Sequence, residues 1–184
     1  MALTLYANGK IETSSGGLQI PNGISTATPV GITHYDTWSL TSTKNWSGQN
    51  VFDADFSRNT NVPSIGDPMT KGANGIFTFP ATGIWEISVQ YKVYDGTPNA
   101  WSECYIEKST NSGTSFTTIG VGDGSLFDDN QATYCTPACR AAFDVTNTST
   151  FKVRLSINNE QGAHVEGHAT NAASSAVFKR IGGT

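Results

Sequence analysis

Residues 84–94 constrain the fold most, because apolar and polar side chains alternate there over eleven positions. A period of two places the two sets on opposite faces of an extended strand. A shift of one residue would turn the whole apolar set toward water, so the register of this strand is strongly determined. The apolar set is Trp85, Ile87, Val89, Tyr91 and Val93, and the residues between them are Glu86, Ser88, Gln90 and Lys92. We therefore expect one face in the core and one polar face turned to solvent or to a partner.

A second alternating stretch covers residues 150–158, where Phe151, Val153, Leu155 and Ile157 lie opposite Lys152, Arg154 and Ser156. Other short apolar runs recur between turn-forming residues, which is typical of a sandwich or barrel. An Ala-rich stretch at 160–173 could form a helix, although Gly162 and Gly167 weaken that interpretation. The predicted strands are 33–41, 51–56, 75–79, 84–94, 101–108, 115–121, 132–145, 150–158 and 174–181.

Composition excludes several classes of function. Charged residues make up only 14%, and 11 Lys and Arg against 15 Asp and Glu give a net charge of -4. Nucleic-acid binding needs clustered Lys and Arg, which this chain lacks. No run approaches the ~20 apolar residues of a membrane span. The first ten residues lack the features of a signal peptide, and three cysteines (Cys104, Cys135 and Cys139) are too few for a disulfide framework. We expect reduced thiols in a protein that is not exported.

Residues 1–31 differ from the rest, since Gly, Ser, Thr and Asn dominate and apolar residues are thinly spread. Such a segment cannot bury enough surface on its own to offset its ordering entropy. Residues 1–31 are therefore either a flexible leader or an extended, irregular N-terminal arm that becomes ordered on a partner. We favour the arm, followed by a globular domain at 32–184. The arm residues expected to contact the partner are Leu3, Leu5, Tyr6, Ile11, Leu18, Ile20 and Ile24.

The spacing of five residues carries a resemblance to a known family: Phe77, Gly83, Trp85, Ile87 and Val89. It is similar to the central signature of the complement globular head, in the jelly-roll superfamily shared with tumour necrosis factor. The ending "SSAVFKRIGG" resembles the final strand of that family. The resemblance covers residues 32–182, which is most of the chain, and implies an all-β jelly-roll sandwich of about ten strands. Because members pack around a threefold axis, it also implies a homotrimer.

The stretch from "YDTWSLTSTKNW" to "GIWEISVQY" also resembles jelly-roll modules of tailed-phage virion proteins. This resemblance implies a viral structural protein, a trimeric capsid decoration (cement) protein that attaches to the shell partly through its arm. Its expected partners are itself and the major capsid protein or another virion protein. Its expected location is the virion, assembled in the host cytoplasm. The alternative is a receptor- or carbohydrate-binding head of a phage fibre, which would bind a host surface glycan.

The sequence "HVEGH" places His164, Glu166 and His168 on one face if the segment is a strand, and these residue types can ligate a metal. The alternative is a glycine-flanked loop without metal, and we predict no cofactor. The chain has no Gly-x-Ser-x-Gly, His-Glu-x-x-His or phosphate-binding glycine loop, so we predict a protein that is not an enzyme.

Several aromatic residues could lie at the surface (Trp38, Trp46, Tyr94, Trp101 and Tyr105). Alternation predicts that Trp101 and Tyr105 share a strand face with Glu103 and Glu107. Aromatic rings beside polar groups are what a glycan-binding surface needs, whereas packing between sheets or subunits is the structural alternative.

Overall fold

The computed structural model describes residues 3–5, 11–13, 31–95, 101–126 and 133–184, and the chain divides into two compact units, Met1–Gly31 and Ile32–Thr184. In the first unit, β1 (Leu3–Leu5) pairs antiparallel with β2 (Ile11–Thr13). These two short strands were not predicted from the sequence. Leu3, Leu5 and Ile11 belong to them, whereas four of the expected arm contacts lie outside the described residues, namely Tyr6, Leu18, Ile20 and Ile24.

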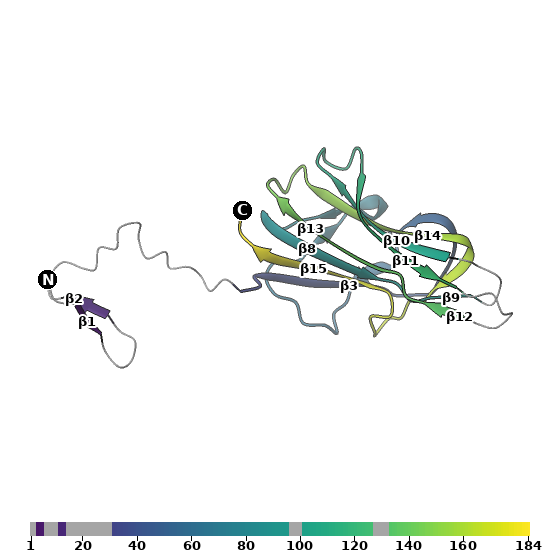
Figure 1. Ribbon diagram of the computed structural model, residues 1–184, viewed down its shortest axis with the longest axis horizontal. Coiled ribbons are helices and arrows are strands. Elements are labelled where there is room, and N and C mark those ends of the chain that lie inside the picture. The colour runs from purple at the N-terminus through teal and green to yellow at the C-terminus, as the bar shows by residue number, and fades with distance from the viewer. Residues whose placement is uncertain (1–2, 6–10, 14–30, 96–100, 127–132) are drawn as a thin grey trace. The chain divides into compact units, whose positions relative to one another are not determined.

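The second unit is a sandwich of two antiparallel sheets (Figure 1). The five-stranded sheet has the order β13-β8-β15-β3-β5. Its strands are β13 (Ala138–Val145), β8 (Gly83–Gln90), β15 (Ser175–Gly182), β3 (His34–Leu40) and β5 (Phe56–Arg58). The strand with the strongest alternation, β8, thus lies in the interior of this sheet, between β13 and β15.

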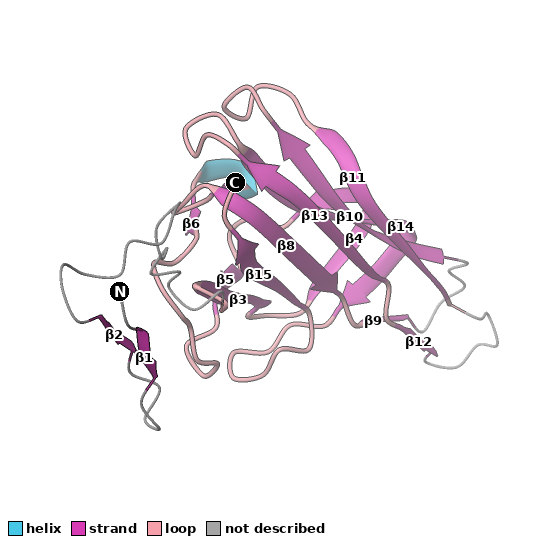
Figure 2. Ribbon diagram, turned by 60° about the vertical axis from the view of Figure 1, so that its left-hand side comes forward, coloured by secondary structure: helices cyan, strands magenta, loops and turns pink. Residues whose placement is uncertain are grey.

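The eight-stranded sheet lies behind the first in Figure 2 and follows the order β11-β10-β14-β7-β6. In addition, β4 and β9 pair with β14, and β12 pairs with β9. The strands are β11 (Thr117–Ser125), β10 (Trp101–Ser109), β14 (Lys152–Val165), β7 (Phe77–Thr78), β6 (Thr70–Lys71), β4 (Lys44–Val51), β9 (Val93–Asp95) and β12 (Thr133–Cys135). One 3-10 turn, η1 (Ala73–Gly75), is the only helical element among the described residues, so the all-β prediction is confirmed.

The core lies between the two sheets and contains the apolar sets that alternation predicted. Trp85 and Ile87 of β8 are at most 1% exposed, and Val153, Leu155 and Ile157 of β14 are fully buried. Aromatic rings fill the space between them. Phe77, for example, packs edge-on against Trp38 with a centroid distance of 5.0 Å, and its ring is tilted by 38° against that of Phe178 at 4.9 Å.

Two predicted strands each turn out to be two strands in different sheets. The expected strand 84–94 consists of β8 in one sheet and β9 in the other, and the expected strand 132–145 consists of β12 and β13. The break between β8 and β9 lies beside the break between β12 and β13, because the backbone N–H of Tyr91 donates to the carbonyl of Pro137 at 3.1 Å. Proline has no N–H for a ladder, so regular pairing stops there. The side chains keep alternating across the break, which is why the sequence does not reveal it.

The Ala-rich stretch is not helical at its start, since β14 continues to Val165. β4 was missed altogether, because its sequence KNWSGQNV is rich in Asn, Ser and Gly, which usually indicate a turn. β4 is held by its ladder to β14 rather than by an apolar face, with only Trp46 packing against the core.

The two sheets meet at one edge, where β11 lies against β13. The inward positions of β11 are the glycines Gly120, Gly122 and Gly124. A methyl group on Gly122 would overlap the carbonyl oxygen of Ala138 in β13. Glycine is therefore required there for the close approach of the two backbones.

Candidate functional site: the outer face of the five-stranded sheet

The outer face of the five-stranded sheet carries mostly small, uncharged side chains. The ladder aligns Ser88 of β8 with Val177 of β15, and Val177 with Thr37 of β3. The next row aligns Gln90, Ser175 and Ser39. These side chains point away from the core, because Val89, Ala176 and Trp38 alternate with them and pack inside it. Thr37, Ser39 and Ser175 are nevertheless at most 7% exposed, so the open part of this face lies over Ser88, Gln90 and Val177.

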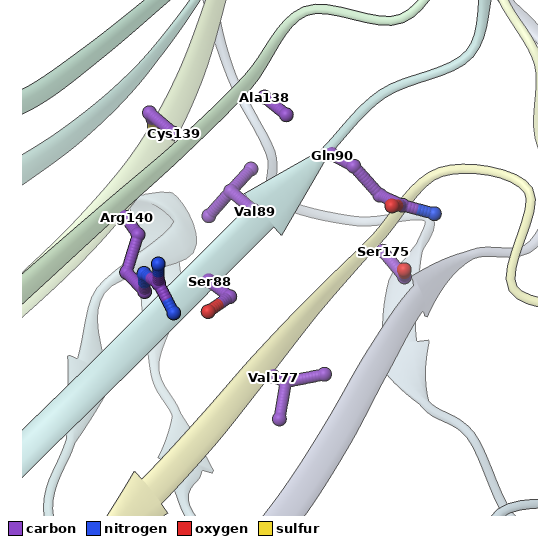
Figure 3. Close-up of a pocket in the computed structure, with 8 residues that line it drawn as sticks. All are labelled: Ser88, Val89, Gln90, Ala138, Cys139, Arg140, Ser175 and Val177. Carbon is purple, nitrogen blue, oxygen red and sulfur yellow. The ribbon is translucent and has the colours of Figure 1, made fainter.

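A groove of about 440 Å³ runs along this face over β13, β8 and β15 (Figure 3). Figure 3 shows Ser88 between Arg140 and Val177, and Gln90 beside Ser175. The lining residues are Ser88, Val89, Gln90, Ala138, Cys139, Arg140, Ser175 and Val177. Arg140 is the only charged member, so the groove is an almost neutral depression on a sheet face.

Three charged side chains of this face contact one another, namely Arg140, which lines the groove, and Glu86 and Lys179 in the adjoining row. Lys179 Nζ lies 2.6 Å from Glu86 Oε1, and Arg140 Nη1 lies 3.7 Å from Glu86 Oε2. The hydrogen bond from Lys179, helped by the positive charges of Lys179 and Arg140, lowers the pKa of Glu86. Both cations of this group therefore share the one carboxylate of Glu86.

The outer face of the eight-stranded sheet is different, since charged and aromatic side chains cover it. Trp101, Glu103, Tyr105 and Glu107 do alternate on this face, as predicted. Arg154 donates to both oxygens of Glu107 at 2.9 Å, and the guanidinium lies 4.3 Å from the centroid of the Phe116 ring. The Tyr105 hydroxyl donates to Glu103, and desolvation followed by this bond raises the pKa of Tyr105.

The family-signature residues are structural. Phe77, Trp85, Ile87 and Val89 are at most 3% exposed, and Gly83 has φ +132°, with Arg180 and Gly182 filling the space a side chain would need. The Trp85 indole N–H donates to the carbonyl of Ala81 at 3.0 Å, which holds the turn after Pro80 against the start of β8. These residues therefore position the groove without lining it, except for Val89.

The three candidate metal ligands are not brought together. His164 stacks on Tyr94, Glu166 pairs with Lys92 at 2.7 Å, and the ring of His168 hydrogen-bonds to Thr170. β14 ends at Val165, so the strand that would align all three does not exist. Across the described part of the chain, no three His, Cys, Asp or Glu side chains form a metal-binding group.

The three cysteines are free thiols. Cys104 is buried, and its hydrogen bond to Cys139 together with burial raises the pKa of Cys104. Burial raises the pKa of Cys135 to about 11. Cys104 and Cys135 therefore stay protonated near neutral pH, which makes them poor nucleophiles.

Comparison with known proteins shows a fold but no family. No family model matches the sequence, and no curated protein matches it. The solved structure of the Eiger TNF from S. frugiperda is similar, with a TM-score of 0.62 and 14% identity over 84% of this chain and 96% of that one. Murine APRIL is similar with a TM-score of 0.54 and 10% identity over 80% of this chain and 98% of that one. The predicted TNF-like jelly roll is thus confirmed.

None of the described residues lies in a helix long and apolar enough to cross a membrane. Sequence reasoning did not identify the groove residues as a site. The available signal was the composition of the outward positions, which carry Ser, Gln and Val where a solvated strand usually carries Lys or Glu. Alternation alone cannot tell a strand face that meets water from one that meets a partner, because it identifies only the residues that point into the core.

Proposed function

We propose that the chain is a self-associating structural protein, a homotrimer that packs through the outer face of its five-stranded sheet. The observation that carries this proposal is the nearly neutral groove between Arg140 and Val177. The fully buried part of a protein interface is depleted in charged residues, and this sheet face has that character. The threefold arrangement is inferred from the resemblance to the tumour necrosis factor superfamily.

We further propose that the trimer decorates the shell of a tailed-phage capsid and is a component of the virion. Support comes from the resemblance to phage jelly-roll modules, the low content of charged residues and the separate unit Met1–Gly31. Three copies of residues 1–31 would contact the major capsid protein or another virion protein. After one arm binds, the others bind effectively intramolecularly, so three weak contacts give strong attachment. No catalytic role is assigned.

Purified particles and electron microscopy test this proposal. The protein should sediment with the particles, and images should show many symmetry-related copies on the shell. A trimer lacking residues 1–31 should remain soluble and lose particle binding. Absence of the protein from particles, or full binding by the truncated trimer, would contradict the proposed attachment.

The second candidate is the receptor- or carbohydrate-binding head of a phage fibre. A specific observation favours it, because the Tyr134 side chain is 60% exposed within a group of aromatic rings. A few copies at the tail, rather than many on the shell, would favour this function over capsid decoration.

A further inference from the structure

Three aromatic rings lie side by side on adjacent strands at one end of the eight-stranded sheet. Tyr94 of β9 is the direct ladder partner of Tyr134 in β12 and of His164 in β14. The Tyr94 and His164 rings are stacked, with a centroid distance of 4.8 Å and an interplanar angle of 13°. Tyr94 and Tyr134 are 5.6 Å apart at 35°. Pairing thus builds a continuous row of rings from residues that are distant in the sequence.

This ring row faces outward. Val93 and Val165, which alternate with Tyr94 and His164, are fully buried in the core. Among the large apolar residues that are well exposed in the described ranges, Tyr134 is the only aromatic one. An exposed ring that continues a row of partly buried rings offers a rigid apolar surface to a ligand.

Polar groups frame the ring row on both sides. Lys92 Nζ lies 2.7 Å from Glu166 Oε2 and 5.3 Å from the centroid of the Tyr134 ring. The backbone N–H of Glu166 donates to the carbonyl of Lys92 at 2.8 Å, which fixes the two strands beside the rings. On the other side, the exposed Asn45 of β4 is the ladder partner of His164. A carboxylate, an ammonium and an amide therefore surround the aromatic surface.

We propose that the ring row of Tyr94, Tyr134 and His164, with Lys92, Glu166 and Asn45 around it, binds a neutral saccharide. A pyranose has an apolar C–H face that can lie on an aromatic ring, and hydroxyls that both donate and accept hydrogen bonds. The rim offers acceptors in Glu166 and Asn45 and donors in Lys92 and Asn45. The proposal does not depend on the trimer, because one chain supplies all six residues. It rests on the second candidate function, the carbohydrate-binding head, and names the site at which that head would bind its ligand.

The charges in the site argue for a neutral ligand. Lys92 already lies over the Tyr134 ring, so that cation-binding position is filled. Glu166 neutralises Lys92, so the site has no free positive charge for an acidic sugar. Its size also argues against a protein ligand, since a stable protein interface takes roughly 20–30 residues from each side.

Saturation-transfer NMR on the full chain would test the proposal with methyl glucoside, methyl galactoside, N-acetylglucosamine and sialic acid as probes. We expect transfer to at least one of the three neutral sugars and none to sialic acid. Tyr134→Ala should weaken binding roughly five-fold, since one aromatic contact contributes about 1 kcal/mol. Because Tyr134 is mostly exposed, this variant should melt at the same temperature as the wild type.

Tyr105→Ala is the matched control, because it removes a ring from the other end of the same sheet surface and should leave sugar binding unchanged. Transfer to none of the three neutral sugars, or equal binding by Tyr134→Ala, would overturn the site. Loss of binding in Tyr105→Ala alone would mean that the saccharide binds near Trp101 and Tyr105 instead of at the ring row. Since sugar binding is measured per chain, its failure is distinguishable from failure of the trimer, which is read from the mass.

Discussion

The two outer faces of the sandwich come from strands that alternate equally well, yet they carry different side chains. The five-stranded face has Ser88, Val177 and Thr37 in one row, and beside them Lys179 and Arg140 both pair with Glu86. The eight-stranded face has Glu107 paired with Arg154, and Glu103 beside Tyr105. The inward residues of both sheets determine the fold, whereas the outward residues determine which face can lose its water at low cost. Only the outer face of the five-stranded sheet can be desolvated at low cost.

The largest expected effect follows from placing a charge on the five-stranded face. Val177→Arg would bury an unpaired charge in each of the three proposed contacts, which costs several kcal/mol. We expect the trimer to dissociate at least about 100-fold more readily, as measured by light scattering after size-exclusion chromatography.

Val121→Arg is the control for that substitution, since Val121 is 52% exposed on the eight-stranded face. It should leave the trimer intact. If Val121→Arg dissociates the protein and Val177→Arg does not, the assignment of the two faces is reversed.

The next largest expected effect is on the free energy of unfolding, through the Glu107–Arg154 ion pair on the outer face of the eight-stranded sheet. Glu107 is only 5% exposed, accepts two hydrogen bonds from Arg154 and accepts a third from the Ser156 hydroxyl at 3.1 Å. Glu107→Gln leaves Arg154 without its counter-charge, so urea unfolding should show a loss of roughly 1–3 kcal/mol. Asp123→Asn, at an exposed position of the same face, should change the free energy of unfolding by less than about 0.5 kcal/mol. Equal losses would show that the Glu107 network contributes nothing specific.

A smaller effect should depend on pH. The pKa of Glu86 is lowered in the folded chain from its ordinary value of 4.5, first by the hydrogen bond from Lys179. A carboxyl with a depressed pKa stabilises the fold above its unfolded pKa, and this contribution is lost as pH falls through the folded pKa. The stability difference between wild type and Glu86→Gln should therefore be present near about pH 7 and shrink below about pH 4.5. A difference that grows on acidification would contradict the lowered pKa.

The smallest effect tests one hydroxyl. Thr37 Oγ1 is buried and has no hydrogen-bond partner among the described residues. Thr37→Val keeps the shape and removes this unpaired group, so we expect a gain of up to about 1 kcal/mol in urea unfolding. Ser39→Ala in the same strand should instead lose about 1 kcal/mol, because its hydroxyl accepts from Asn59 Nδ2 at 3.0 Å. A loss in both variants would contradict the absence of a hydrogen-bond partner for Thr37 Oγ1.

The fold could be predicted largely because β8 and β14 alternate strongly and the Phe77–Val89 spacing resembles a known family. The division of 84–94 and 132–145 between two sheets could not, since side-chain periodicity continues across a backbone break. For the same reason, the sequence did not show that the strand ends within "HVEGH", where a metal site was considered. His164 and Glu166 do face outward, but the strand ends at Val165, and their partners Tyr94 and Lys92 come from β9 and the residue just before it. Which residues meet across strands depends on register, which a single sequence does not state.

The proposed trimer can be tested directly by sedimentation equilibrium of the intact chain at micromolar concentration and near-neutral pH. Self-association through the five-stranded face predicts a single species of three times the 19.5 kDa chain mass. A species of 19.5 kDa that persists as concentration rises would contradict it.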